Sequence, residues 1–63
     1  MASQRDFMRM LVKKLGRDKE KVCAAYADAE RNGEVARLSN KSEISPEAYA
    51  EALYDDGERK GWF

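Results

Sequence analysis

The stretch ISPEAYAEALYDDGERKGW, in the last third of the chain, constrains the fold more than any other part of the sequence. Ser45 is a favoured N-cap residue, and Pro46 follows at the first helical position, where a missing N–H does no harm. Gly61 suits the left-handed conformation that ends many helices. These signals predict a helix over residues 46–60. An alternative end at Gly57 is less favourable, because it places two aspartates in the last turn against the helix dipole.

One face of this predicted helix carries Tyr49, Leu53 and Gly57 at a spacing of four residues. Residues at this spacing lie above one another on a helix. Because Gly57 has no side chain, we expect another backbone to approach the helix there. Trp62 follows the helix directly, and we expect its indole to fold back onto the body of the domain.

Two further amphipathic helices are predicted over residues 4–15 and 19–31. Ser3 and Asp18 are their N-caps, and Gly16 ends the first of them. Apolar residues recur along each helix at intervals of three and four, which is typical of a helix with one buried face. The core that this pattern predicts comprises Phe7, Leu11, Leu15, Val22, Tyr26, Leu38, Tyr49, Leu53 and Trp62.

The fold class that follows is all-α: a compact, helix-turn-helix-like domain of three helices that spans residues 1–63. A chain of 63 residues makes one domain, and its small core leaves it marginally stable. Residues 34–38 form either a short strand or an extra helical turn. If they form a strand, residues 61–63 can pair with it as a two-stranded ribbon, which is stable only when it packs on the helices.

The composition argues against catalysis, cofactors and metals. The chain has one cysteine, Cys23, and no histidine, so neither a zinc site nor an internal disulfide is expected. Without a histidine base, Cys23 is predicted to be a buried, unreactive side chain. No apolar run approaches the length of about 18 residues that a membrane span needs. We therefore expect a non-enzymatic cytoplasmic protein that needs no cofactor and has no membrane partner.

Charge is distributed unevenly along the chain although the net charge is zero. Residues 1–21 hold seven Lys or Arg and three Asp or Glu, which leaves the rest of the chain acidic. Arg5, Arg9 and Lys13 recur every four residues opposite the apolar face of the first helix, and such a stripe can neutralise phosphates. An ordinary solvated helix face is the alternative. The predicted nucleic-acid-binding residues of this basic third are Arg5, Arg9, Lys13, Lys14, Arg17, Lys19 and Lys21.

Residues 7–38 combine a helix, a short turn, a second helix and the sequence GEVAR. The residues that carry this pattern are Leu15, Gly16, Val22, Ala25 and Glu30, followed by Gly33 to Arg37. The arrangement resembles the helix-turn-helix and the start of the wing in bacterial winged-helix regulators. In that family the second helix enters the major groove. The resemblance implies phosphate contacts from Arg17, Lys19, Lys21 and Arg37, although this second helix carries acidic residues near its end.

The acidic last helix suggests a second function, the binding of a protein partner. Tyr54 is predicted to point away from the apolar face, and an exposed aromatic among acids can anchor an interface. The predicted protein-binding residues are Glu51, Tyr54, Asp55 and Glu58. The tail also resembles small bacterial and prophage proteins, which implies an inhibitor or adaptor of the phage type. A homodimer is a further alternative. The function expected first is a nucleic-acid-binding or regulatory module, and protein binding is its alternative.

Overall fold

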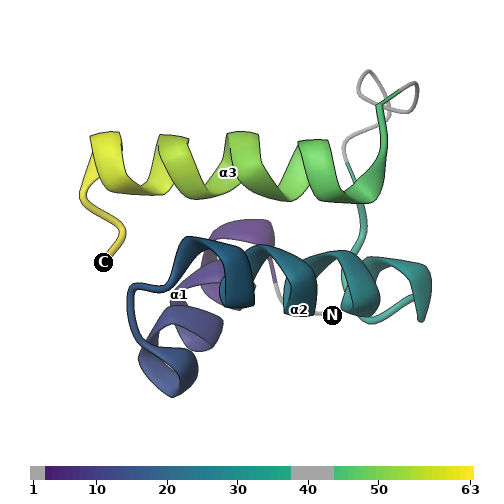
Figure 1. The fold of residues 1–63 in the computed structure, drawn as a ribbon, viewed down its shortest axis with the longest axis horizontal. Coiled ribbons are helices and arrows are strands. Elements are labelled where there is room, and N and C mark those ends of the chain that lie inside the picture. The colour runs from purple at the N-terminus through teal and green to yellow at the C-terminus, as the bar shows by residue number, and fades with distance from the viewer. Residues whose placement is uncertain (1–2, 38–43) are drawn as a thin grey trace.

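Three helices form the fold within residues 3–37 and 44–63, the part of the chain that the computed structural model describes (Figure 1). They are α1 (Gln4–Leu15), α2 (Lys19–Arg31) and α3 (Pro46–Lys60). The bounds predicted from the sequence are therefore confirmed, and so is the all-α class for the described residues.

The helix ends follow the capping residues. The side chains of Ser3, Asp18 and Ser45 each accept a hydrogen bond from a backbone N–H in the first turn of the helix that follows. Each bond satisfies a donor that the helix itself leaves unpaired. Gly61 adopts the left-handed conformation, with φ 74° and ψ 32°, and its N–H donates to the carbonyl of Gly57. The longer form of the last helix is therefore correct.

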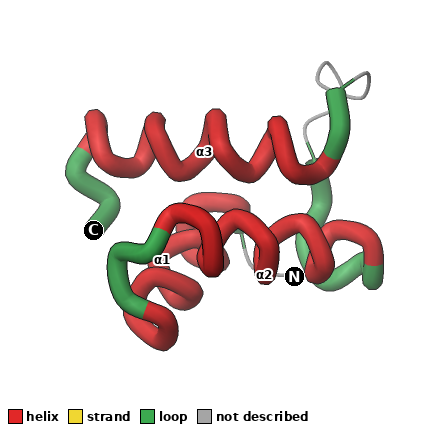
Figure 2. Tube along the Cα trace, viewed as in Figure 1, coloured by secondary structure: helices red, strands yellow, loops and turns green. Residues whose placement is uncertain are grey.

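Helix α2 lies at the centre of the arrangement (Figures 1 and 2). It runs antiparallel to α3, with which it makes its larger interface, and α1 packs on it from another side. The molecule is nearly isometric, with extents of 26 × 22 × 21 Å. Its buried side chains come from all three helices and from the segment after α2. They include Met8, Leu11, Val12, Val22, Tyr26, Val35, Tyr49, Ala50, Leu53 and Tyr54.

The residues predicted for the centre of the core are buried, but one residue predicted for its edge, Leu15, is exposed. Leu15 is 42% exposed, because it is the last residue of α1 and lies where the chain turns away towards α2. Met8 and Val12 are buried in α1 together with Leu11. Phe7 and Trp62 are only half-buried and pack against the edge of the core. Leu38 lies outside the described residues.

The ribbon that the sequence allowed does not form in the described residues of its two segments, 34–37 and 61–63. Val35 is buried in the core. The left-handed Gly61 turns the tail back, so that the N–H of Trp62 donates to the carbonyl of Gly57, 2.9 Å away. The tail is therefore a helix cap that folds onto α3, and it makes no ladder with the segment after α2.

Candidate nucleic-acid interface

The C-terminal tail, residues 61–63, packs against α3 at Gly57. The missing side chain of this glycine leaves a notch for the rings of the tail. A Cβ atom built on Gly57 would lie 2.6 Å from Cε1 of Phe63 and 2.9 Å from Cε3 of Trp62. Both distances are shorter than a carbon contact allows. The glycine was expected to admit another backbone, but it admits two aromatic rings of the same chain. Phe63 also packs on Tyr54, with 5.1 Å between the ring centroids.

Cations of α1 and of the end of α3 surround this tail. Two hollows open beside it, and Arg9 and Trp62 line both of them. The first hollow, of about 420 Å³, is lined by Asp6, Arg9, Met10, Val12, Lys13, Trp62 and Phe63. The second, of about 310 Å³, is lined by Arg5, Arg9, Lys60, Gly61 and Trp62.

Two cations also lie against the aromatic rings of the tail. Nζ of Lys60 is 5.8 Å from the centroid of Trp62, and Cζ of Arg17 is 5.8 Å from the centroid of Phe63. Both distances are within the range of a cation–π interaction. We call the resulting surface the basic-aromatic face. It consists of Arg5, Arg9, Lys13, Arg17 and Lys60, together with Trp62 and Phe63.

Most cations of this face form no ion pair with another described residue. Ion pairs within the described residues involve Arg5, Lys19, Arg31, Arg37 and Arg59. Of these cations only Arg5 belongs to the face, and its atom Nε lies 3.8 Å from Asp6 in an exposed pair. Such exposed pairs contribute little and exchange readily with solvent. The face can therefore offer its cations to an anionic partner.

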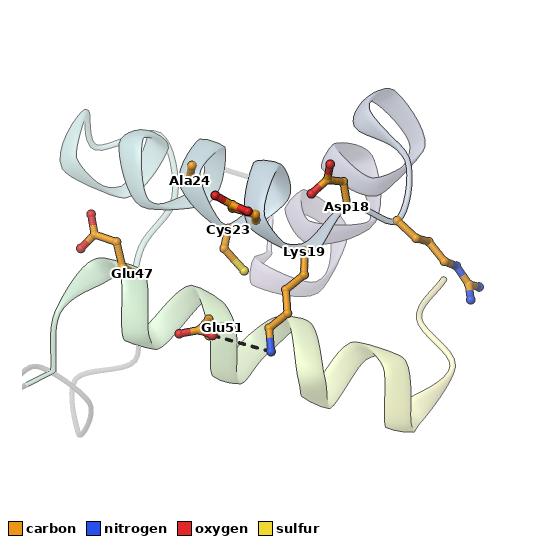
Figure 3. A pocket seen from close by; sticks show the side chains of 8 residues that line it. Asp18, Lys19, Cys23, Ala24, Glu47 and Glu51 are labelled. Carbon is orange, nitrogen blue, oxygen red and sulfur yellow. Dashed lines mark ion pairs between the residues drawn. The ribbon is translucent and has the colours of Figure 1, made fainter.

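Lys19 was predicted to contact phosphate, but the structure places it elsewhere. Its atom Nζ lies 2.9 Å from Asp55 and 3.7 Å from Glu51, so it joins α2 to α3. The hydrogen bond to Asp55 raises the pKa of the Lys19 ammonium. Lys19 and Glu51 border a groove of about 830 Å³ between the two helices (Figure 3). Lys19, a predicted phosphate contact, thus pairs with Glu51 and Asp55, two of the predicted protein-binding residues.

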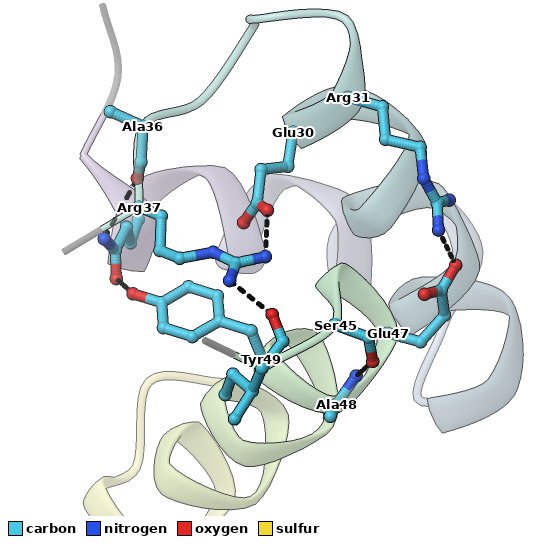
Figure 4. A network of polar contacts seen from close by, with 10 residues as sticks. Glu30, Arg31, Ala36, Arg37, Ser45, Glu47, Ala48 and Tyr49 are labelled. Carbon is cyan, nitrogen blue, oxygen red and sulfur yellow. Dashed lines mark hydrogen bonds and ion pairs between the residues drawn. The ribbon is translucent and has the colours of Figure 1, made fainter. Parts of the chain in front are cut away.

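Arg37, implied as a phosphate contact by the resemblance, lies inside a polar network instead (Figure 4). Its side chain is 14% exposed and forms an ion pair with Glu30, whose side chain is 13% exposed. A second nitrogen donates to the carbonyl of Ile44 at 2.5 Å, and the guanidinium lies 5.0 Å from the ring centroid of Tyr49. The hydrogen bond with Glu30 raises the pKa of Arg37 further. Arg37 thus joins the segment after α2 to Glu30 of α2 and to Ile44, just before α3.

The remaining predicted cations, Lys14 and Lys21, are exposed but line neither hollow. Sequence reasoning did not place Lys60 among the candidate contacts. It also assigned Trp62 to the core and gave Phe63 no role beyond the ribbon. The pattern Lys60, Gly61, Trp62 contained the signal, because a left-handed glycine returns the next side chain to the end of its own helix.

The predicted protein-binding set is divided by the structure. Tyr54 was expected to be exposed, but only 3% of its surface is accessible, because it packs between the core and Phe63. Burial raises the pKa of its hydroxyl. Glu51 and Asp55 pair with Lys19, while Glu58 remains exposed. The aromatic anchor of that interface is therefore lost.

Cys23 and the acidic side chains are also candidates for reactive or metal-binding groups. Cys23 is 6% exposed, and burial raises the pKa of its thiol. Within residues 3–37 and 44–63, no group of three or more Cys, Asp or Glu side chains is placed to hold a metal ion. No helix in the same ranges has the length and apolar character needed to cross a membrane.

Comparison of the chain with protein-family models, with curated proteins and with solved structures found no match. The resemblance to winged-helix regulators therefore stays a prediction.

Proposed function

We propose that the protein is a non-enzymatic nucleic-acid-binding module that contacts phosphates through its basic-aromatic face. The observation that carries this proposal is the clustering of five cations around the tail, drawn from both ends of the sequence. Among the described residues, Asp6 is the one acid that lines either hollow. A patch of one sign attracts a polyanion and releases its counterions on binding.

The proposal keeps a helix-turn-helix-like order of elements but moves the contact from α2 to α1. The exposed positions of α2 include Glu20 and Asp28, which would repel phosphate. Its exposed Arg31 is paired with Asp28 and Glu47. Two other sides of α2 are covered by α1 and α3. The exposed stripe of α1, in contrast, carries Arg5, Arg9 and Lys13.

Fluorescence anisotropy with a labelled oligonucleotide, measured over a range of salt concentrations, tests the proposal. If four phosphates are neutralised, log K should fall with log salt with a slope of about −3 for a single strand. The double variant Arg9→Glu, Lys13→Glu should weaken binding at least tenfold at low salt. It should also reduce the slope by about 1 for each lost contact.

The matched control is Lys14→Glu with Lys21→Glu, which changes the net charge by the same amount at exposed positions outside both hollows. This variant should retain most of the affinity and most of the salt slope. Equal losses in the two double variants would mean that net charge alone drives binding. No binding by the unmodified protein at low salt would refute the proposed function.

A further inference from the structure

We infer that Trp62 is a stacking platform for an unpaired base, so that the ligand of the basic-aromatic face is single-stranded nucleic acid. This inference rests on the proposed function and adds the class of nucleic acid to it. Its basis is the position of the indole, which lines both hollows and is flanked by cations of α1 and α3.

The indole is fixed on one side and open on another. Cε3 of Trp62 lies in the notch at Gly57, which holds the ring against α3. The residue is nevertheless only half-buried and lines two hollows. A ring that is held in place loses little conformational entropy when a ligand stacks on it.

The surroundings of the ring match the parts of a nucleotide strand. Arg9 borders both hollows, Lys13 borders the first, and Lys60 borders the second. A strand that places one base on Trp62 can therefore place phosphates beside cations on either side of that base. Proteins that bind single strands combine a positive groove with aromatic side chains in this way.

The size of the hollows favours a single base over a duplex. Their volumes, about 420 and 310 Å³, lie at the small end of the range for ligand sites. Bases in a duplex are stacked on their neighbours, so an aromatic ring reaches their faces only after they are unstacked. A duplex could contact the cations of α1, but it would leave the indole unused.

The ammonium of Lys60 lies over the ring of Trp62. The ammonium lies 5.8 Å from the ring centroid, within the range of a weak cation–π interaction. An incoming base can replace the ammonium on the ring, and the ammonium can then pair with the adjoining phosphate. One exposed interaction is thereby exchanged for stacking together with a charge-assisted contact.

Intrinsic fluorescence provides the test, because Trp62 is the single tryptophan of the chain. The unmodified protein is titrated at low salt with three ligands of equal phosphate number. They are an oligothymidylate of about ten nucleotides, an abasic oligomer of the same length and a hairpin duplex. Stacking should quench the emission with the oligothymidylate, while the abasic oligomer should bind about tenfold more weakly without such quenching.

The outcomes separate this inference from the proposed function. Equal affinity for the thymidylate and the abasic oligomer would overturn stacking and leave phosphate binding in place. An affinity for the duplex at least equal to that for the thymidylate would also overturn it. Failure to bind any of the three would refute both proposals. Equal emission changes with anionic lipid vesicles and with thymidylate would overturn the choice of ligand.

A variant adds a second reading of the same contact. Trp62→Leu keeps an apolar side chain in the notch but removes the stacking surface, and circular dichroism shows whether the variant folds. A folded variant should lose about tenfold in affinity for the oligothymidylate and keep its affinity for the abasic oligomer. If the variant does not fold, the three-ligand comparison on the unmodified protein still decides the question.

Discussion

The cations of the α2–α3 side and those of the basic-aromatic face have different surroundings. On the first side, Lys19 and Arg31 each contact carboxylates of α3 and so join two helices. On the face, Arg9 and Lys13 border open hollows beside the tail. Lysine and arginine therefore hold helices together on the α2–α3 side, whereas on the basic-aromatic face they remain available to a partner.

The helical position of a cation does not decide its role. Lys13 and Lys19 lie on successive helices, and sequence reasoning assigned both to phosphate binding. The structure separates them because α3, far away in the sequence, places Asp55 beside Lys19.

Removing the guanidinium of Arg37 should have the largest effect on stability. In Arg37→Met the carboxylate of Glu30 would stay nearly buried without its partner. A partly buried carboxylate that loses its ion pair is unfavourable, so we expect the largest loss in the free energy of unfolding among these variants, measured in urea. Arg9→Met, the control on the basic-aromatic face, should change the same quantity by less than about 0.5 kcal/mol. Similar losses in the two variants would contradict the distinction between the regions.

Adding a methyl group at Gly57 should displace the tail. The new Cβ would overlap the rings of Phe63 and Trp62. We expect a net loss of about 1 kcal/mol, because overpacking outweighs the gain in helix propensity. The emission of Trp62 should move to longer wavelength as the ring becomes exposed. Glu58→Ala, in the same turn, is the control for which no shift is expected. A more stable Gly57→Ala variant with unchanged emission would show that the tail does not occupy the notch.

Truncating Lys19 should have a smaller effect. Lys19→Ala removes contacts of one ammonium with Asp55 and Glu51, but all three side chains are substantially exposed. We expect a small loss of stability, because exposed ion pairs contribute little, and a double-mutant cycle with Asp55→Ala should show the coupling. Lys13→Ala should leave stability nearly unchanged. In the nucleic-acid binding assay the order of the two effects should be reversed, so that Lys13→Ala weakens binding more than Lys19→Ala does.

The smallest expected effect is a dependence of stability on pH that arises from Glu47. A hydrogen bond from Arg31 lowers the pKa of its carboxyl below the ordinary value of 4.5. This contribution to stability should be present above pH 4.5 and be lost as the pH falls through the lowered pKa of the folded state. Denaturation at a series of acidic pH values measures it. The Arg31→Ala variant should show a weaker dependence over the same range, and an identical dependence would exclude this pair as its source.

Local signals were sufficient to predict the helices. Ser3, Asp18, Ser45 and Gly61 act within one turn of their own positions, so their effects can be read without knowing the tertiary structure. The end of α3 at Gly61 was predicted from the charges of its last turn.

The burial of single side chains was predicted less well, because it depends on what packs across the chain. Tyr54 lies on the side of α3 that the returning tail covers, and the helical pattern of α3 alone does not show that tail. The pattern of α1 alone predicts its stripe of cations. The positions of Lys60 and Trp62 beside that stripe depend on how the tail folds back, so they were not predicted. A site built from two ends of a sequence becomes visible only when the path of the chain between them is known.

Gln4 illustrates how distant segments depend on one another. Its side-chain amide donates to the carbonyl of Ala36 at 3.0 Å, and its carbonyl accepts from the hydroxyl of Tyr49 at 2.6 Å. The first turn of α1 is thus tied to the segment after α2 and to the first turn of α3. Fraying of any one of these three segments therefore removes a tether from the other two. We expect the amide protons of all three to exchange with solvent through a shared opening event.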